Sequence, residues 1–131
     1  RFFFLFLAAV SLFVGGVGVM NIMLISVKQK TREIGLRKAV GATDTDIRLQ
    51  FFTETIVLTG LGTAIGFILG TIVSYLIAMV IQSLGYEYVF SISFGAVLFA
   101  FILALLVGAL FGFVPAQRAA ALDPIEALRY E

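Results

Sequence analysis

The sequence predicts an all-α membrane protein with three transmembrane helices, a short helix at the cytoplasmic face and an interfacial helix near the C-terminus. Hydrophobic residues make up 61% of the 131 residues and charged residues only 13%, which is too little charge for the surface of a soluble domain. Residues 3–27, 55–82 and 92–114 each exceed the roughly 18 apolar residues that cross a bilayer. We therefore expect residues 1–131 to form one membrane domain without a separate soluble domain.

The basic residues predict the orientation of the chain. Residues 28–53 hold six of the nine Lys and Arg residues, whereas the loop at residues 83–91 holds none. By the positive-inside rule, residues 28–53 and the tail, residues 115–131, are cytoplasmic. Arg1 then lies outside, so we expect a span or outer domain upstream in a longer polypeptide. The first apolar run is too long for a signal peptide and lacks its flanking pattern.

The polar segment 28–53 contains helix-ending and helix-starting residues. Glu33 and Arg37, spaced i, i+4, and the apolar positions nearby predict that the first helix continues beyond the membrane. Gly41 suits the left-handed residue that ends a helix. Thr43 suits an N-cap, with Asp44 and Asp46 in the first turn of the next helix. That helix, to about Gln50, either runs into the second span or turns near the interface. Two interpretations stay open: a solvated hairpin, or a crosswise helix that docks into a soluble partner.

The tail carries a second capping pattern. Asp123, Pro124 and Glu126 match an N-cap, a proline at the first helical position and an acidic third position. Ile125 and Leu128 are expected to form an apolar stripe. This helix either lies on the bilayer or also contacts the partner of the segment 28–53.

Small residues recur every fourth position in two of the spans and cluster in the first. They let helix backbones approach closely in lipid. The stripes serve packing within the three helices, or packing against a second subunit. The candidate packing residues are Gly15, Gly18, Gly62, Gly66, Gly70, Gly108 and Gly112.

The residue types exclude several kinds of site. The chain has no His and no Cys, and it lacks the phosphate-binding loop G-x-x-x-x-G-K-[ST]. We therefore expect no catalytic residue, no metal ligand and no cofactor in this segment, and the localised charges do not indicate nucleic-acid binding. Glu54, at the start of the second span, is expected to be an interfacial residue or to pair with a nearby basic residue such as Arg48 or Arg37.

Four ordered motifs resemble those of a known family. They are GGVGVMNIM at residues 15–23, TREIGLRKAVGAT at residues 31–43, Gln50-Phe51 with Glu54, Leu58, Gly62 and Gly66, and Pro115-Ala116 with RAA at residues 118–120 and LDPIEAL at residues 122–128. From end to end the chain is similar to the C-terminal membrane portion of FtsX-like permeases of ABC transporters, most closely the MacB type. It departs from the family pattern at Thr55, Thr63 and Ala121.

The resemblance implies a function. Such permeases work as dimers in the bacterial cytoplasmic (inner) membrane, coupled to a nucleotide-binding domain, fused or separate, that binds ATP and Mg. A periplasmic adaptor and an outer-membrane channel are further partners. By this resemblance, ATP hydrolysis moves the permease helices, and their motion drives export or extraction of a drug, peptide, toxin or lipoprotein. One alternative is an FtsX-like signalling permease that activates an extracytoplasmic hydrolase or senses peptide antibiotics. The other alternative is a passive membrane scaffold. The residues that the resemblance assigns to coupling with the ATPase are Gly41, Ala42, Thr43, Asp44, Asp46, Ile47, Arg48 and Gln50.

Overall fold

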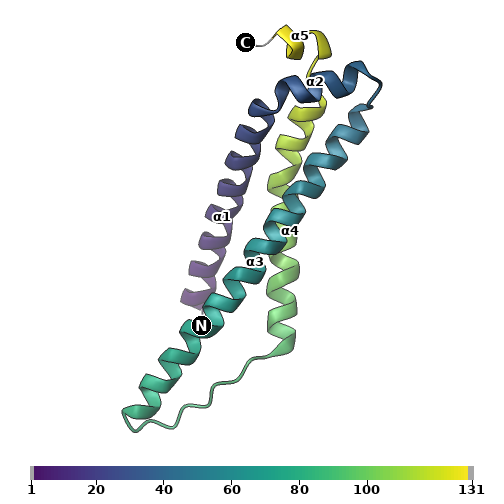
Figure 1. The fold of residues 1–131 in the computed structure, drawn as a ribbon. Coiled ribbons are helices and arrows are strands. Elements are labelled where there is room, and N and C mark those ends of the chain that lie inside the picture. Colours follow the sequence, from purple (N-terminus) through teal and green to yellow (C-terminus); the bar gives the residue numbers. More distant parts are fainter. Residues whose placement is uncertain (1, 130–131) are drawn as a thin grey trace.

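Three long helices form an elongated bundle with a short helix across one end (Figure 1). The computed structural model describes the backbone of residues 2–129 and the side chains of residues 2–127, and within that range it contains helices and no strand. The elements are α1 (Phe2–Gln29), α2 (Thr31–Ala39), α3 (Asp44–Ser83), α4 (Phe94–Ala120) and α5 (Pro124–Arg129). Helices α2 and α5 lie together at the upper end of Figure 1, called here the α2 end.

The three long helices contain the predicted spans, and each is apolar enough to cross a membrane. Only Ile92 and Ser93 of the third predicted span precede their helix, which begins at Phe94. Helix α3 has 40 residues, so its length of about 60 Å is twice the roughly 30 Å of the hydrocarbon core. The predicted helix at Asp44–Gln50 is therefore not a separate element. It forms the first turns of α3 and runs directly into the second span.

The sequence pattern predicted that the first helix continues through the polar segment, and this prediction is wrong. The first helix ends at Gln29, and α2 starts at Thr31 in a new direction. The Thr31 hydroxyl donates a hydrogen bond to the carbonyl of Val27 at 3.0 Å, a side-chain bond that bends helices. The short crosswise helix is therefore α2, which lies across the ends of the long helices in Figure 1.

The helix that contains the last predicted span continues beyond the end of that span. The tail was expected to begin at Pro115, but α4 continues through this proline to Ala120. A proline removes one backbone hydrogen bond, and packing against neighbouring helices can compensate for that loss. Pro115 is among the fully buried side chains, next to buried Ala116, so tertiary packing holds the helix together at this point.

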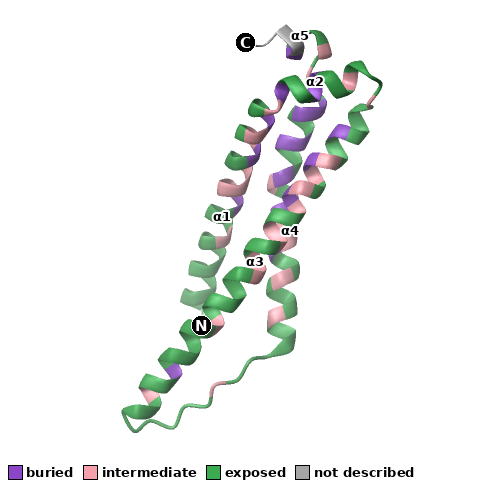
Figure 2. Cartoon of the chain, in the orientation of Figure 1, coloured by how far each residue is buried: buried purple, intermediate pink, exposed green. Residues whose placement is uncertain are grey.

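The packed core lies at the α2 end. Figure 2 shows the buried residues gathered there, whereas the opposite half of the bundle is almost entirely exposed. The exposed side chains along the long helices are mostly large and apolar, as expected for surfaces that face lipid. The core cluster consists of Met23, Val27, Ile34, Ile47, Phe51, Ala116 and Ala119.

Helices α3 and α4 pack through threonines against glycines. A Cβ atom added to Gly108 would lie 2.5 Å from the Thr59 hydroxyl oxygen, and one added to Gly112 would lie 2.5 Å from the Thr55 methyl carbon. Threonines four residues apart on one helix thus fit over glycines four residues apart on the other. Small residues at such a seam allow close backbone approach in lipid. On α1 the close approach is at Gly16, against Phe111 of α4.

The other predicted packing glycines do not make close approaches within the chain. A Cβ atom added to any of them would meet no atom within 4 Å in the part of the chain that the structure describes. Their stripe on α3 therefore borders open space rather than a closely packed helix of the same chain, and its contact with a second subunit stays a prediction. These residues are Gly15, Gly18, Gly62, Gly66 and Gly70.

The two glycine environments predict opposite effects of the same substitution. Gly108→Ala should destabilise the bundle by roughly 1–3 kcal/mol because Thr59 blocks the new methyl group. Gly66→Ala should stabilise the helix by about 0.5–1 kcal/mol because glycine is a poor helix former. Thermal unfolding of the two variants in detergent measures both effects. Equal shifts of the two thermal midpoints would contradict the close packing of the α3 threonines against the α4 glycines.

Candidate functional site

The turn between α2 and α3, residues 40–43, is fixed at both sides by capping. Gly41 has φ +109°, and the amides of Gly41 and Ala42 donate to the carbonyls of Lys38 and Arg37 at 3.0 Å. This is the Schellman pattern, and it confirms Gly41 as the residue that ends the helix. We call residues 36–50, which contain this turn, the α2–α3 corner.

Helix α3 begins with the predicted cap. The Thr43 hydroxyl accepts from the Asp46 amide at 3.2 Å, and an Asp46 carboxylate oxygen accepts from the Thr43 amide at 2.9 Å. Asp46 precedes the apolar stretch of α3 and lies outside the membrane-spanning part. Its hydrogen bonds with the Thr43 side chain and backbone lower the pKa of its carboxyl below the usual 3.8. Since the folded state favours the ionised form, the cap contributes fully at neutral pH and weakens as the pH falls below 3.8.

Lys38 links three helix ends. Its ammonium group donates to the carbonyl oxygens of Ala120 and Leu122, the latter at 3.0 Å, and lies 2.7 Å from a carboxylate oxygen of Asp44. The Lys38 side chain is only 9% exposed. The last carbonyls of α4 have no partner within their own helix, and a cation there also complements the helix dipole. One ammonium group therefore joins α2 to the end of α4 and the start of α3.

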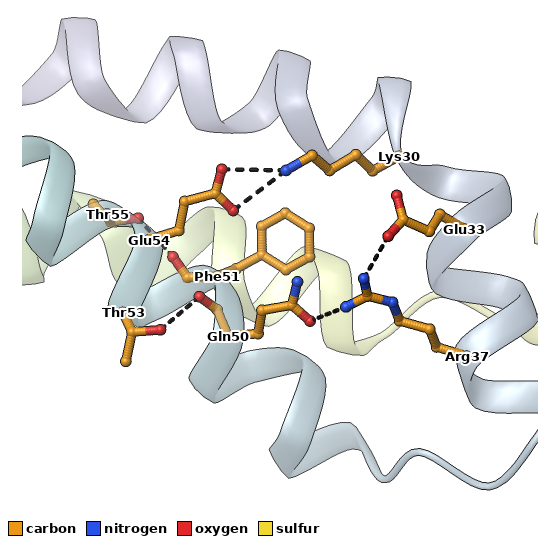
Figure 3. Close-up of polar contacts among 8 residues, drawn as sticks. All are labelled: Lys30, Glu33, Arg37, Gln50, Phe51, Thr53, Glu54 and Thr55. Atoms are coloured by element: carbon orange, nitrogen blue, oxygen red, sulfur yellow. Dashed lines mark hydrogen bonds and ion pairs between the residues drawn. The ribbon is translucent and has the colours of Figure 1, made fainter.

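A second polar group joins α2 to α3 on the other side of the corner (Figure 3). The Lys30 ammonium donates to Glu54 at 3.2 Å and lies 5.8 Å from the centre of the Phe51 ring. Arg37 donates to Gln50 at 2.6 Å and also pairs with Glu33. Glu54 therefore pairs with a basic residue, as predicted, but that residue is Lys30 and neither Arg48 nor Arg37. The bend at residues 30–31 turns Lys30 toward α3, which sequence spacing alone did not reveal.

Helix α5 folds back and packs on α2. A Cβ atom added to Gly35 would lie 2.6 Å from the Cβ of Ala127, so the two helices meet closely at this glycine. Asp123 accepts from the Ile125 amide at 2.7 Å, which confirms it as the cap. Ile125 is 71% exposed and Ala127 is buried; the side chain of Leu128, the second member of the predicted stripe, lies outside the described side chains. Contact with α2 is thus made through Ala127.

The predicted coupling residues divide by burial. Gly41, Thr43, Asp44, Asp46 and Arg48 are exposed, whereas Ala42 and Gln50 are half-buried. Ile47 is only 2% exposed and belongs to the core cluster. Its side chain therefore supports the corner from inside and is not available to a partner.

Two large exposed apolar residues on the α2 side of the corner were not among the predicted site residues. Leu36 is 57% exposed and Val40 is 81% exposed, on the last turn of α2 and directly after it. Both follow from the pattern TREIGLRKAV once the buried face of α2 is known to be Ile34 and Gly35. They extend the candidate site from the turn onto the outer face of α2.

Comparison with known proteins agrees with this architecture. The family model for the FtsX-like permease C-terminal region matches residues 5–124. The chain belongs to this family. With three apolar helices, this FtsX-like permease region is a multi-pass membrane protein.

Curated relatives cover almost the whole chain. The chain is 52% identical to a "Probable export ATP-binding/permease protein" of Pseudomonas fluorescens over 122 residues. The matched residues make up 93% of this chain and 18% of the relative. The chain is 51% identical over 125 residues to the "Macrolide export ATP-binding/permease protein MacB" of Bdellovibrio bacteriovorus, covering 95% and 18%. A probable syringafactin export ATP-binding/permease protein, SyfD, of Pseudomonas syringae is 49% identical over 93% of this chain and 18% of the relative. The chain thus spans about a fifth of the length of these relatives.

Removing the Lys38 ammonium should strongly destabilise the packing of α2 against the ends of α3 and α4. Lys38→Met leaves the Ala120 and Leu122 carbonyls without their donor, and we expect a loss of roughly 2–4 kcal/mol. Lys28→Met is the matched control: Lys28 is exposed and should shift stability by less than about 0.5 kcal/mol. Thermal unfolding and tryptic cleavage at the corner report both changes. A Lys38→Met protein as stable as Lys28→Met would rule out the linking role.

Proposed function

We propose that this chain is the transmembrane permease part of a MacB-like ABC exporter. In this proposal an ATP-binding domain moves the α2–α3 corner, and the long helices carry the motion to the opposite face of the membrane. The observation that carries the proposal is the corner itself: a capped turn, locked to α4 by Lys38, with exposed apolar residues at its tip. The names of the relatives combine ATP binding, permease and export, which favours export over signalling.

The corner is built to move as one piece. Capping fixes the turn at both sides, Lys38 holds it to the end of α4, and Lys30 and Arg37 hold α2 to α3. A displacement of α2 is therefore transmitted to α3, α4 and α5 together. Helix α3 is continuous over its 40 residues, so a tilt at the corner reaches the far end of the bundle without an intervening hinge.

The docking surface in this proposal is the outer face of the corner. Leu36 and Val40 present apolar area, and Gly41, Thr43 and Asp46 surround it as an exposed rim. An apolar centre with a polar rim suits a groove on a soluble partner. Three neighbouring residues also have structural roles: Asp44 forms the ion pair with Lys38, Asp46 caps α3, and Ile47 belongs to the core cluster. Substitutions at these positions would therefore disturb the fold as well as the docking.

The remaining parts of the machine follow from the relatives and from the charge distribution. ATP and Mg would bind to a nucleotide-binding domain on the same polypeptide, a proposal supported by the names of the relatives, which combine ATP binding with permease. A second permease subunit would pair with the first, with an adaptor and an outer-membrane channel as further partners. The basic α2 end and the C-terminus would face the cytoplasm of a bacterial inner membrane.

A single substitution at the tip of the corner should uncouple ATP hydrolysis from transport. In the full-length protein, we expect Val40→Gln to reduce substrate transport per ATP hydrolysed by about tenfold, the typical effect of a contact worth more than 1 kcal/mol. The combined variant Leu36→Gln/Val40→Gln should be more severe. Reconstituted vesicles allow ATPase and transport rates to be measured together.

The matched control for this experiment is Val89→Gln. Val89 is 85% exposed, compared with 81% for Val40, but it lies in the loop at the opposite end of the bundle. This variant should keep the normal ratio of transport to ATPase activity. The docking surface is refuted when Val40→Gln and Val89→Gln behave alike.

The same two positions test the orientation. The sequence contains no cysteine, so Val40→Cys and Val89→Cys introduce well-exposed thiols at opposite ends. In intact cells a membrane-impermeant maleimide should label Val89→Cys and leave Val40→Cys unlabelled. The reverse pattern would invert the proposed topology.

A further inference from the structure

Arg48 is a cation without a counter-charge at the edge of the membrane. It forms no ion pair with any side chain that the structure describes. Asp44 lies four residues earlier on α3, a spacing that favours an ion pair on a helix surface. The Asp44 carboxylate is instead 2.7 Å from the Lys38 ammonium. Because Lys38 occupies the natural partner of Arg48, the guanidinium is left exposed with its full charge.

Beside Arg48 runs an apolar groove between α3 and α4. Its volume is about 250 Å³, and its walls are Thr45, Arg48, Leu49, Phe52 and Phe113. The four residues from α3 are spaced i, i+3, i+4 and i+7, so they share one face of the helix. Leu49 is 60% exposed and Phe113 is 48% exposed. The groove therefore has a cationic end and an aromatic, aliphatic body.

The groove crosses the boundary between hydrocarbon and headgroups. Phe113 belongs to the apolar run of α4, and Phe52 lies just before the charge-free stretch of α3 that starts at Thr55. Arg48 is one helical turn beyond Phe52, a rise of about 6 Å along the axis. The polar layer of each leaflet is roughly 5–8 Å thick. With Phe52 and Phe113 at the edge of the hydrocarbon, the guanidinium of Arg48 reaches the level of lipid phosphates.

We propose that this groove binds an anionic phospholipid of the cytoplasmic leaflet. The lipid phosphate pairs with Arg48, whose planar guanidinium can hold two phosphate oxygens, and an acyl chain lies along Leu49, Phe52 and Phe113. Charge complementarity and membrane depth select this occupant, because a purely apolar partner would leave the cation unpaired. The choice of leaflet rests on the orientation proposed above, whereas the groove and its ligand do not depend on export.

Lipid selectivity of the full-length protein tests the site. In nanodiscs of phosphatidylcholine with a minor fraction of phosphatidylglycerol, native mass spectrometry measures how strongly the protein retains the anionic lipid. Arg48→Gln should weaken this preference roughly fivefold, because it removes the direct hydrogen-bonded contact between the guanidinium and the lipid phosphate. Arg48→Lys should keep most of it, since it retains the charge.

Arg32→Gln is the matched control. Arg32 is exposed at the same end of the bundle and forms no ion pair with the described side chains, so the loss of its charge should leave the preference nearly unchanged. The proposal is overturned if Arg48→Gln and Arg32→Gln have equal effects. It is also overturned if inorganic phosphate abolishes the preference, or if cysteines at residues 49 and 113 cross-link to another copy or segment of the protein. None of these measurements involves ATPase or transport activity. A negative result for the lipid site would therefore not count against the export proposal.

Discussion

The ammonium group of Lys38 joins parts of the chain that lie more than eighty residues apart. It donates to the carbonyl of Ala120, 82 residues away, and to that of Leu122, 84 residues away, while Asp44 balances its charge. The last carbonyls of a helix have no intrahelical partner, and leaving them unsatisfied in a packed environment is costly. With this group in place, α2 lies across the ends of α3 and α4, and α5 is positioned where Ala127 meets Gly35. The crosswise arrangement of the α2 end therefore depends on one nearly buried cation.

Packing is distributed unevenly along the bundle. The core cluster occupies the α2 end, and the Thr–Gly seam between α3 and α4 continues it as far as Thr59 and Gly108. Beyond that point the long helices present mainly exposed apolar side chains. In lipid, helices without close backbone contacts gain little from association, because the surrounding acyl chains are as apolar as the side chains. A well-packed end joined to a loosely packed one is the arrangement that the proposed transmission of motion requires.

The candidate site was partly predictable. The caps at Gly41, Thr43 and Asp46 depend on neighbours in sequence, and the structure has them where the pattern predicted. Glu54 pairs with a residue 24 positions away, and Lys38 binds carbonyl groups more than eighty positions away, so no local spacing could identify these contacts. Ile47 shows the same limit: the resemblance assigned it to coupling with the ATPase, yet only the tertiary packing shows that it faces the core. The asymmetric use of the glycines had no signal in the stripes, which look alike on α3 and α4.

The sequence by itself determined the class of the protein, the number of spans, the position of the polar corner and the family. The family depends on the resemblance of four ordered motifs. The other three depend on composition, on the length of apolar runs and on short-range capping, all of which involve residues close in the chain. Only the tertiary structure decided that the helix bends at Thr31 and that α4 continues through Pro115. It also decided that Lys38 pairs with Asp44, so that Arg48 has no ion pair among the described side chains. The physical reason is that side-chain hydrogen bonds, burial and ion pairs between distant segments override local preference when several partners compete for one group.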